Sequence, residues 1–203
     1  MVAVIDYDAG NIKSVEKAVL SLGGDVRITR DRDEILMADH VILPGVGAFG
    51  DAMEKLHQYG LADVIRETVQ KQTPFLGICL GLQLLFESSE ESEGVQGLGI
   101  LPGSIVRLPE KAGLKIPHIG WNSLRYPNRG RLFEGVPEES YVYFVHSYYL
   151  ATRDPQIVTA TTEYAAHIHA SVEKGNVFAC QFHPEKSSDV GMRILRNFMQ
   201  ITG

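Results

Sequence analysis

This chain of 203 residues has no long apolar run, no cysteine-rich framework and no excess of positive charge. Its longest apolar stretches, such as residues 74–80, are far shorter than the roughly 20 residues that a membrane-spanning helix needs. The opening segment MVAVIDYDAGN has no basic region and carries two early aspartates, unlike a secretory signal. We therefore expect a cytoplasmic protein with no membrane partner.

The charge balance is mildly acidic, with 19 Lys and Arg against 25 Asp and Glu and a formal net charge of -6. A surface that binds nucleic-acid phosphates is basic, so this balance argues against a nucleic-acid partner. It leaves small molecules and other proteins as candidate ligands.

The only cysteines are Cys79 and Cys180, which leaves a single disulfide open in principle but makes it unexpected in a reducing compartment. No Cys-x-x-Cys or Cys-x-x-His spacing occurs. His167 and His169 alternate along one strand-like segment without a third ligand nearby, which favours an exposed strand face. We expect neither a metal site nor a cofactor.

The first half of the chain alternates short apolar segments with helical patterns. The expected strands are 2–5, 26–29, 40–43 and 75–78, and the expected helices are 11–22, 52–58, 61–72 and 80–87. Such alternation predicts a mostly parallel sheet covered on both faces. The Ser-, Glu- and Gly-rich segment 88–97 is expected to be a solvated loop.

The second half is richer in strand patterns separated by short turns. Strands are expected at 105–107, 141–145, 157–161, 167–172 and 177–181, and a final helix at 189–201. These patterns predict antiparallel strands added to the parallel sheet. No linker interrupts the chain, so we expect one α/β domain over residues 1–203.

Cys79 is the candidate nucleophile. It stands in Gly-Ile-Cys-Leu-Gly, after an apolar strand pattern and before a helical one, and the same spacing around serine forms the nucleophile elbow of hydrolases. The flanking glycines permit close backbone approach, and a helix N-terminus facing the sulfur favours a thiolate. Taken alone, the motif is equally compatible with a buried structural cysteine. Cys180, in the middle of a strand pattern, is expected in the core.

His183 and Glu185 are the candidate base and its orienting carboxylate. An apolar strand pattern ends at His183, and active sites of open α/β sheets form at the carboxyl ends of strands. Pro184 fixes the turn between them, so Glu185 can fold back onto the imidazole in a Cys–His–Glu arrangement. Each residue alone also fits a surface position, His183 at a strand end and Glu185 near a helix N-terminus.

The segment Pro-Gly-Val-Gly at 44–47 follows another predicted strand and precedes a helix. Its glycines allow backbone N–H groups to turn toward a developing oxyanion. The same features can bind a phosphate, but the segment lacks the Gly-Lys-Ser/Thr and Gly-x-Gly-x-x-Gly patterns of nucleotide-binding loops.

Together these three segments resemble the class I (triad) glutamine amidotransferase family. The family pattern of Pro-Gly-x-Gly, Gly-x-Cys-x-Gly and His-Pro-Glu occurs here in order at 44–47, 77–81 and 183–185. Gln83 matches the extended motif Gly-x-Cys-x-Gly-x-Gln. The resemblance implies a flavodoxin-like amidotransferase fold and a catalytic triad of Cys79, His183 and Glu185.

Four further segments are similar, more narrowly, to the glutaminase subunits of imidazole glycerol phosphate synthases. They are IDYDAGN at 5–11, HIGWN at 118–122, YFVHSY at 143–148 and ASVEKGN at 170–176. The resemblance covers essentially the whole chain and implies a heterodimer with a cyclase subunit that is a (β/α)₈ barrel. Such a barrel takes about 250 residues, so a chain of 203 residues cannot hold both parts.

The resemblance also implies an activity. Glutamine is hydrolysed to glutamate and ammonia through a thioester on Cys79, and the ammonia passes to the cyclase. The cyclase then makes imidazole glycerol phosphate and an aminoimidazole carboxamide ribotide (AICAR) in histidine biosynthesis. In such subunits the glutaminase is nearly silent until ligand binds the distant cyclase site, which is an allosteric coupling between two sites.

Residue roles follow from the resemblance in three groups. The expected oxyanion donors are Gly45, Val46, Gly47 and Leu80. The expected glutamine-binding residues are Gln83, Ser147 and Tyr148. The expected contacts with the partner are Asn11, Trp121, Tyr143 and Lys186.

Two alternatives remain at this point. One is a class I glutaminase subunit that serves another acceptor, in pyridoxal phosphate, purine, anthranilate or carbamoyl phosphate synthesis. The other is a non-catalytic binding or stress protein on the same fold, since fold alone does not fix function. Proteins of the second kind often keep the elbow cysteine and lose the His-x-Glu pair, whereas both are present here.

Overall fold

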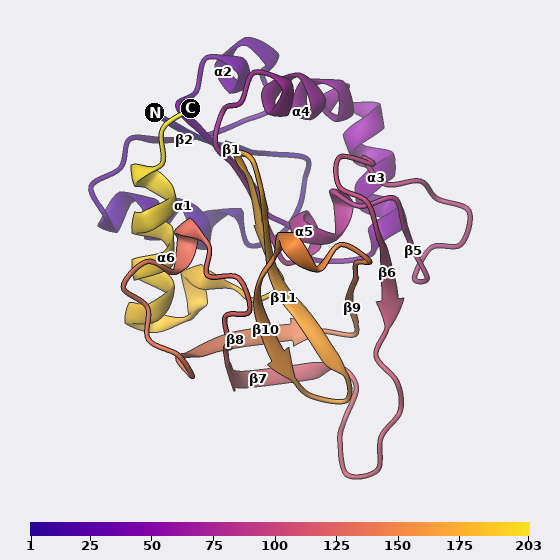
Figure 1. Ribbon diagram of the computed structural model, residues 1–203. Helices are drawn as coiled ribbons and strands as arrows, with labels where there is room; N and C mark the ends of the chain where they lie inside the picture. The colour runs from indigo at the N-terminus through magenta and orange to yellow at the C-terminus, as the bar shows by residue number, and fades with distance from the viewer.

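A seven-stranded sheet forms the centre of the computed structural model, which describes residues 1–203 (Figure 1). The spatial order is β10-β11-β12-β4-β3-β1-β2. The strands are β1 (Val2–Ile5), β2 (Val26–Thr29), β3 (His40–Leu43), β4 (Phe75–Ile78), β10 (Val158–Glu163), β11 (His167–Lys174) and β12 (Val177–Cys180). From β2 to β12 neighbouring strands are parallel, whereas β11 and β10 are antiparallel additions. The parallel part has the flavodoxin-like strand order.

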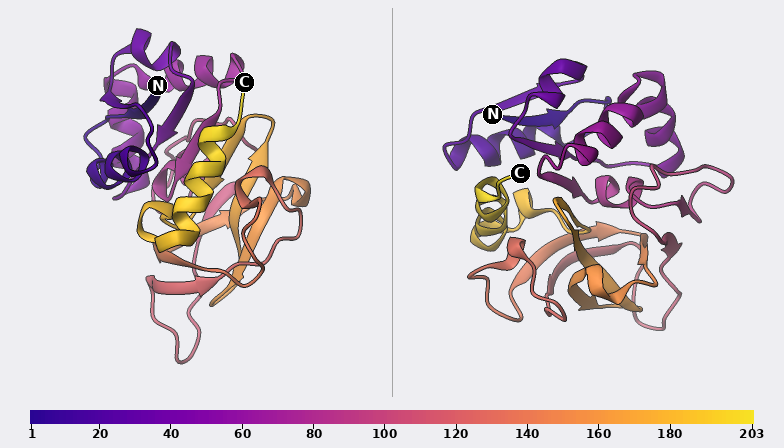
Figure 2. Two further views of the ribbon diagram at one scale, coloured as in Figure 1. Left: turned by 90° about the vertical axis from the view of Figure 1, so that its left-hand side faces the viewer. Right: turned by 45° about the horizontal axis from the view of Figure 1, so that its top comes forward.

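Helices cover both faces of this sheet (Figure 2). They are α1 (Ile12–Ser21), α2 (Arg32–Leu36), α3 (Phe49–Gln58), α4 (Leu61–Gln70), α5 (Leu80–Leu84) and α6 (Ser188–Gln200). Alternate residues of a strand point to opposite faces. Accordingly Val2 and Val4 pack with α1 and α6, while Ala3 and Ile5 pack with the other helices. Two buried apolar layers therefore hold the ends of the parallel strands in place.

The second half of the chain adds two small sheets. One pairs β7 (His118–Ser123) with β8 (Tyr141–His146) in antiparallel fashion, and the other contains β5 (Ser88–Ser89), β6 (Ser104–Arg107) and β9 (Tyr148–Ala151). The loop between β6 and β7 projects at the bottom of Figure 1. Short 3₁₀ turns occur at Arg131–Phe133, Pro155–Ile157 and Pro184–Lys186. The mostly parallel sheet with added antiparallel strands confirms the predicted fold class.

The strands of the first half have the predicted bounds, but the helix expected at 80–87 ends at Leu84. The following segment explains the early end. Leu98 donates its N–H to the Leu84 carbonyl, and both Ile100 and Leu101 donate to the Leu85 carbonyl. These bonds satisfy the carbonyls that would otherwise continue the helix. The sequence patterns also missed α2, β7 and β9.

The prediction of a solvated loop at 88–97 is wrong in part. Ser89 is buried in β5. Glu91 and Ser92 accept hydrogen bonds from the N–H groups of Phe49 and Gly50 at 2.8 and 2.9 Å. The methyl side chain of Ala48, at the N-cap of α3, cannot accept these hydrogen bonds. The polar segment therefore caps the helix although it is distant in sequence.

No helix of the structure is both long and apolar enough to cross a bilayer. No group of three or more His, Cys, Asp or Glu side chains is arranged to hold a metal ion. Both cysteines are free thiols and both are buried.

Candidate active site

The three predicted motifs meet at one edge of the central sheet. The strands β1, β3, β4 and β12 are neighbours and parallel, so their carboxyl ends lie side by side. The segments that follow them carry Tyr7, Gly45, Cys79 and His183, respectively. This edge is where ligands bind in open α/β sheets.

Cys79 occupies a strained junction between β4 and α5. Its backbone has φ 55° and ψ -108°, a conformation that residues other than glycine rarely adopt. The turn is tight because the flanking glycines leave no room for a Cβ. At Gly81 a Cβ would lie 1.9 Å from the Leu43 carbonyl oxygen, and at Gly77 it would lie 2.7 Å from the Gly81 carbonyl oxygen. The Gly-x-Cys-x-Gly spacing is therefore a steric requirement of this turn.

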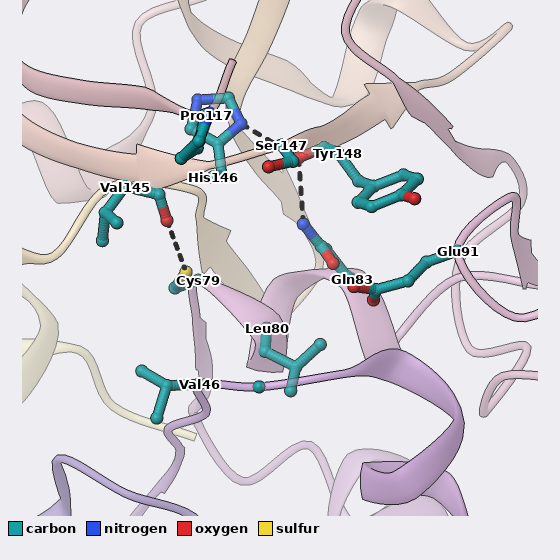
Figure 3. A pocket seen from close by; sticks show the side chains of 11 residues that line it. Val46, Cys79, Leu80, Gln83, Glu91, Pro117, Val145, His146, Ser147 and Tyr148 are labelled. Atoms are coloured by element: carbon teal, nitrogen blue, oxygen red, sulfur yellow. Dashed lines mark hydrogen bonds between the residues drawn. The ribbon is translucent and has the colours of Figure 1, made fainter.

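A pocket of about 300 Å³ opens in front of the sulfur (Figure 3). Its lining joins seven of the predicted site residues with four that sequence reasoning did not select, and consists of Val46, Gly47, Cys79, Leu80, Gln83, Glu91, Pro117, Val145, His146, Ser147 and Tyr148. The thiol of Cys79 donates to the Val145 carbonyl across 3.9 Å. The sulfur of Cys79, the predicted nucleophile, therefore lies at the wall of a small-molecule-sized cavity.

His183 neighbours Cys79, but neither His183 nor Glu185 is among the residues that line the pocket. His183 Nδ1 and Glu185 Oε1 are 2.7 Å apart, and both side chains are almost completely buried. The 3₁₀ turn at Pro184–Lys186 brings them together, as the sequence predicts. The backbone N–H of His183 donates to the Tyr143 carbonyl at 2.9 Å, which fixes the backbone of His183 against β8. Asn11 donates its side-chain amide to the same Glu185 oxygen.

The environment of His183 favours its charged form. Burial alone lowers the pKa of His183, but the neighbouring Cys79 sulfur and the Glu185 carboxylate outweigh burial and raise it to about 9. His183 Nε2 is buried without a hydrogen-bond partner within the protein. An imidazolium held in this way can give its proton to a group that comes within hydrogen-bond reach of Nε2.

The glycine-rich loop 44–47 is held by buried contacts. The hydroxyl of Tyr7 donates to the Pro44 carbonyl at 2.8 Å, and burial raises the pKa of Tyr7. The Leu80 N–H, an expected oxyanion donor, donates to the Gly45 carbonyl at 3.3 Å. The N–H groups of Gly45, Val46 and Gly47 donate to no protein group, and Gly47 has φ +108°. Three of the four expected donors are thus free in this conformation and Leu80 is engaged.

The expected glutamine-binding residues line the same pocket. Gln83 donates its side-chain amide to the Tyr148 carbonyl at 3.0 Å, and Ser147 and Tyr148 form the opposite wall in Figure 3. Glu91 adds a carboxylate that the sequence did not point to. Its segment has only a polar composition, and nothing in the local sequence indicates that it folds over the N-terminus of α3.

The four residues expected to contact a partner are partly or fully exposed. Trp121 on β7 is 50% exposed, pairs with Tyr143 on β8 and meets its ring edge-on at 6.2 Å. Lys186 is exposed. Asn11 is half-buried because its amide contacts Glu185.

Comparison with known proteins identifies the class to which this fold and site belong. A sequence model described as "Glutamine amidotransferase class-I" matches residues 3–201. The chain belongs to the class-I glutamine amidotransferase family, as predicted. Its enzyme activity is therefore that of a glutamine amidotransferase, a glutaminase.

Within that family the chain is similar to one particular kind of subunit. It is 53% identical to "Imidazole glycerol phosphate synthase subunit HisH" of Moorella thermoacetica over 98% of this chain and 94% of that protein. It is 51% identical to the HisH subunit of Bacillus cereus strain G9842 over 99% and 95%. The resemblance to glutaminase subunits of imidazole glycerol phosphate synthases is confirmed.

Solved structures support the fold. One described as "Crystal structure of glutamine amidotransferase" superposes with a TM-score of 0.77 at 21% identity, covering 98% of each chain. The structure of PurLQS from Thermotoga maritima has a TM-score of 0.72 at 20% identity, covering 98% of this chain and 96% of that one.

Proposed function

We propose that this chain is the glutaminase subunit of an imidazole glycerol phosphate synthase and that Cys79, His183 and Glu185 form its catalytic triad. The observation that carries the proposal is the position of Cys79. Its sulfur lies at a strained turn in the wall of a pocket, next to a buried imidazole–carboxylate pair. Residues 1–203 would act as one catalytic domain.

The first half of the reaction acylates the enzyme. The Cys79 thiolate attacks the side-chain amide carbon of glutamine, and the oxygen that becomes negative is stabilised by backbone N–H groups. Gly45, Val46 and Gly47 supply the free donors, and Leu80 becomes one if it leaves the Gly45 carbonyl. One such donor is typically worth about 3–4 kcal/mol. His183, charged at neutral pH because its pKa is raised to about 9, protonates the amide nitrogen of the tetrahedral intermediate, and the C–N bond breaks to release ammonia.

The second half releases glutamate. The glutamyl thioester on Cys79 is attacked by a water molecule, and His183, now neutral, accepts the proton of that water. Glu185 orients the imidazole through Nδ1 and stabilises its charged form each time it is protonated. The thiolate is regenerated when the tetrahedral intermediate collapses.

The pocket offers complementary groups for the other end of glutamine. The Glu91 carboxylate suits the substrate's amino group, while Gln83, Ser147 and Tyr148 suit its carboxylate and backbone atoms. A preorganised polar lining of this kind fixes orientation, which allows the amide carbon to be held next to the sulfur.

Ammonia is useful only if it reaches its acceptor before it escapes. We place the docking face for a cyclase subunit, itself a (β/α)₈ barrel, at Asn11, Trp121, Tyr143 and Lys186, so that the two proteins form a heterodimer. Trp121 supports this because it is a large apolar side chain left half exposed. The partner would use ammonia to make imidazole glycerol phosphate and AICAR, in the cytoplasm and within histidine biosynthesis.

The test measures glutamate release from glutamine by the chain alone, with a cyclase subunit, and with that subunit plus its acceptor ligand. Negligible activity alone and a steep rise only in the third condition are expected. Cys79→Ala must abolish the activity. Glutamate release that survives Cys79→Ala would exclude the mechanism, and strong activity indifferent to the cyclase would assign the chain to another acceptor.

The coupling has a structural candidate in the loop 44–47. Activation would require Leu80 to release the Gly45 carbonyl and the loop to turn an N–H toward the oxyanion. Hydrogen exchange at Val46 should therefore change when acceptor ligand binds to the complex. Identical exchange with and without ligand would rule out this loop as the switch.

A further inference from the structure

A buried polar side chain remains that the mechanism above does not use. Gln181 follows β12, is completely inaccessible to solvent, and lies two residues before His183. Its Nε2 is 3.7 Å from the sulfur of Cys79, within hydrogen-bond distance for sulfur. A buried amide beside a reacting atom has a chemical consequence that depends on which end of the amide faces that atom.

The orientation of this amide is fixed by its neighbours. The Tyr148 carbonyl can only accept, so the Gln83 group 3.0 Å from it is the nitrogen. The same Gln83 nitrogen lies 3.2 Å from the other end of Gln181, which must therefore be the oxygen. The nitrogen of Gln181 is left facing Cys79. One backbone carbonyl thus determines two amide orientations in succession.

A pair of buried histidines supports that carbonyl from the opposite side. His146 Nδ1 is 2.9 Å from the Tyr148 oxygen and so carries the hydrogen. His146 Nε2 then accepts from His118 Nδ1 at 3.0 Å. His118 is stacked between Phe144 and Tyr164, with ring centroids 4.9 and 4.0 Å away. This packing leaves His146 little freedom to turn away from Tyr148.

The hydrogen-bond energies of the two contacts of the sulfur change when Cys79 loses its proton. As a thiol, Cys79 donates to the Val145 carbonyl. As a thiolate it has no hydrogen to donate, and that carbonyl oxygen then faces a negative charge. The Gln181 N–H becomes more favourable in the same step, because a hydrogen bond to a charged acceptor is stronger than one to a neutral acceptor.

We propose that Gln181 is a further catalytic residue, an uncharged hydrogen-bond donor to the Cys79 thiolate, and that Gln83 and His146 are the positioning residues that keep its N–H directed at the sulfur. The inference deepens the proposed glutaminase function and rests on it. It assigns Gln83 a second task in addition to contact with glutamine.

The experiment uses Gln181→Met in the complex with the cyclase subunit, since methionine has a similar volume and no N–H. The matched control is Gln58→Met, at an exposed position on α3 far from the pocket. Alkylation by iodoacetamide at a fixed pH reports the reactivity of Cys79 without any need for glutamine. Cys79→Ala supplies the background, which should be small because Cys180 is fully buried and burial raises its pKa.

Gln181→Met is expected to slow alkylation and to lower kcat by about 10- to 100-fold, the range for one hydrogen bond to a charged group. KM should change less than kcat, and the thiolate ultraviolet absorbance at that pH should fall. Gln83→Met should slow alkylation in the same direction by releasing Gln181, which provides a second route if Gln181→Met does not fold. Gln58→Met should match the wild type.

Wild-type alkylation rates in both folded variants would overturn the proposal, as would a loss confined to KM. The alkylation result is independent of the proposed function. If the wild-type complex releases no glutamate yet Gln181→Met still slows alkylation, the glutaminase assignment fails while the contact with the sulfur stands.

Discussion

Replacement of Gly81 by alanine tests whether the turn at Cys79 depends on close backbone approach. The added Cβ would lie 1.9 Å from the Leu43 carbonyl oxygen and 2.9 Å from the Leu43 carbonyl carbon. These are backbone atoms in the central strand β3, so the clash cannot be relieved by rotation of a side chain. Either β3 or α5 must move, and β3 leads directly into the loop 44–47.

Two effects of opposite sign determine how much Gly81→Ala changes the free energy of unfolding. Alanine in a helix is favoured over glycine by about 1 kcal/mol. Overpacking a core costs about 1–3 kcal/mol and occasionally more, and a clash between two backbones places this case near 4 kcal/mol. The net destabilisation of Gly81→Ala is therefore about 3 kcal/mol. At about 2–4 °C per kcal/mol for a chain of this size, Tm should fall by roughly 6–12 °C.

Urea unfolding of the wild type, Gly81→Ala and Gly113→Ala provides the assay. Gly113 has φ +83° in the exposed loop between β6 and β7, and a Cβ there meets nothing within 4 Å. Its replacement should cost only the left-handed backbone penalty of about 1 kcal/mol and leave glutamine hydrolysis intact. Equal unfolding free energies for the two variants, or full activity of the Gly81→Ala complex, would refute the steric argument.

The remaining predictions concern the buried ionisable groups. Glu185→Gln should lower the pKa of His183, because a negative charge is removed, and reduce kcat; NMR titration of the imidazole checks this. Burial lowers the pKa of His118 to about 4 and that of His146 to about 3, so the unfolded chain binds more protons and stability should fall as pH drops from 6.5 toward 3, measured by urea unfolding. For His183 the sign reverses, and its stabilising contribution, complete below pH 6.5, is lost as pH rises through about 9. Tyr7→Phe should cost about 1 kcal/mol in unfolding free energy through one lost hydrogen bond; an unchanged value would contradict the role of its hydroxyl.

Local patterns predicted the elements that position the triad. The four-residue strands β1 and β4 are apolar throughout because both faces of a parallel strand are buried. The Gly-x-Cys-x-Gly turn is also visible locally, since its steric requirement falls on residues two positions from the cysteine. These features therefore needed no knowledge of distant contacts.

The parts that were missed depend on distant contacts. Glu91 joins the pocket because its segment caps α3, and Gln181 matters because Gln83 and Tyr148 orient it. His146 gains its role from a backbone carbonyl two residues away and a histidine on another strand. Nothing in the sequence around these residues indicates those contacts, so only the folded arrangement of the chain identifies them.

The insertion of β12 between β4 and β11 has a consequence for how the protein is made. β4 ends at Ile78 and its neighbour β12 begins only at Val177, so one edge of β4 stays unpaired while all the residues between them are synthesised. An unpaired apolar edge is a site of aggregation, and pairing across so long a separation is slow. The same delay withholds His183 and Glu185 from Cys79, so under the proposed mechanism the ribosome-bound chain cannot hydrolyse glutamine before its last strand is in place.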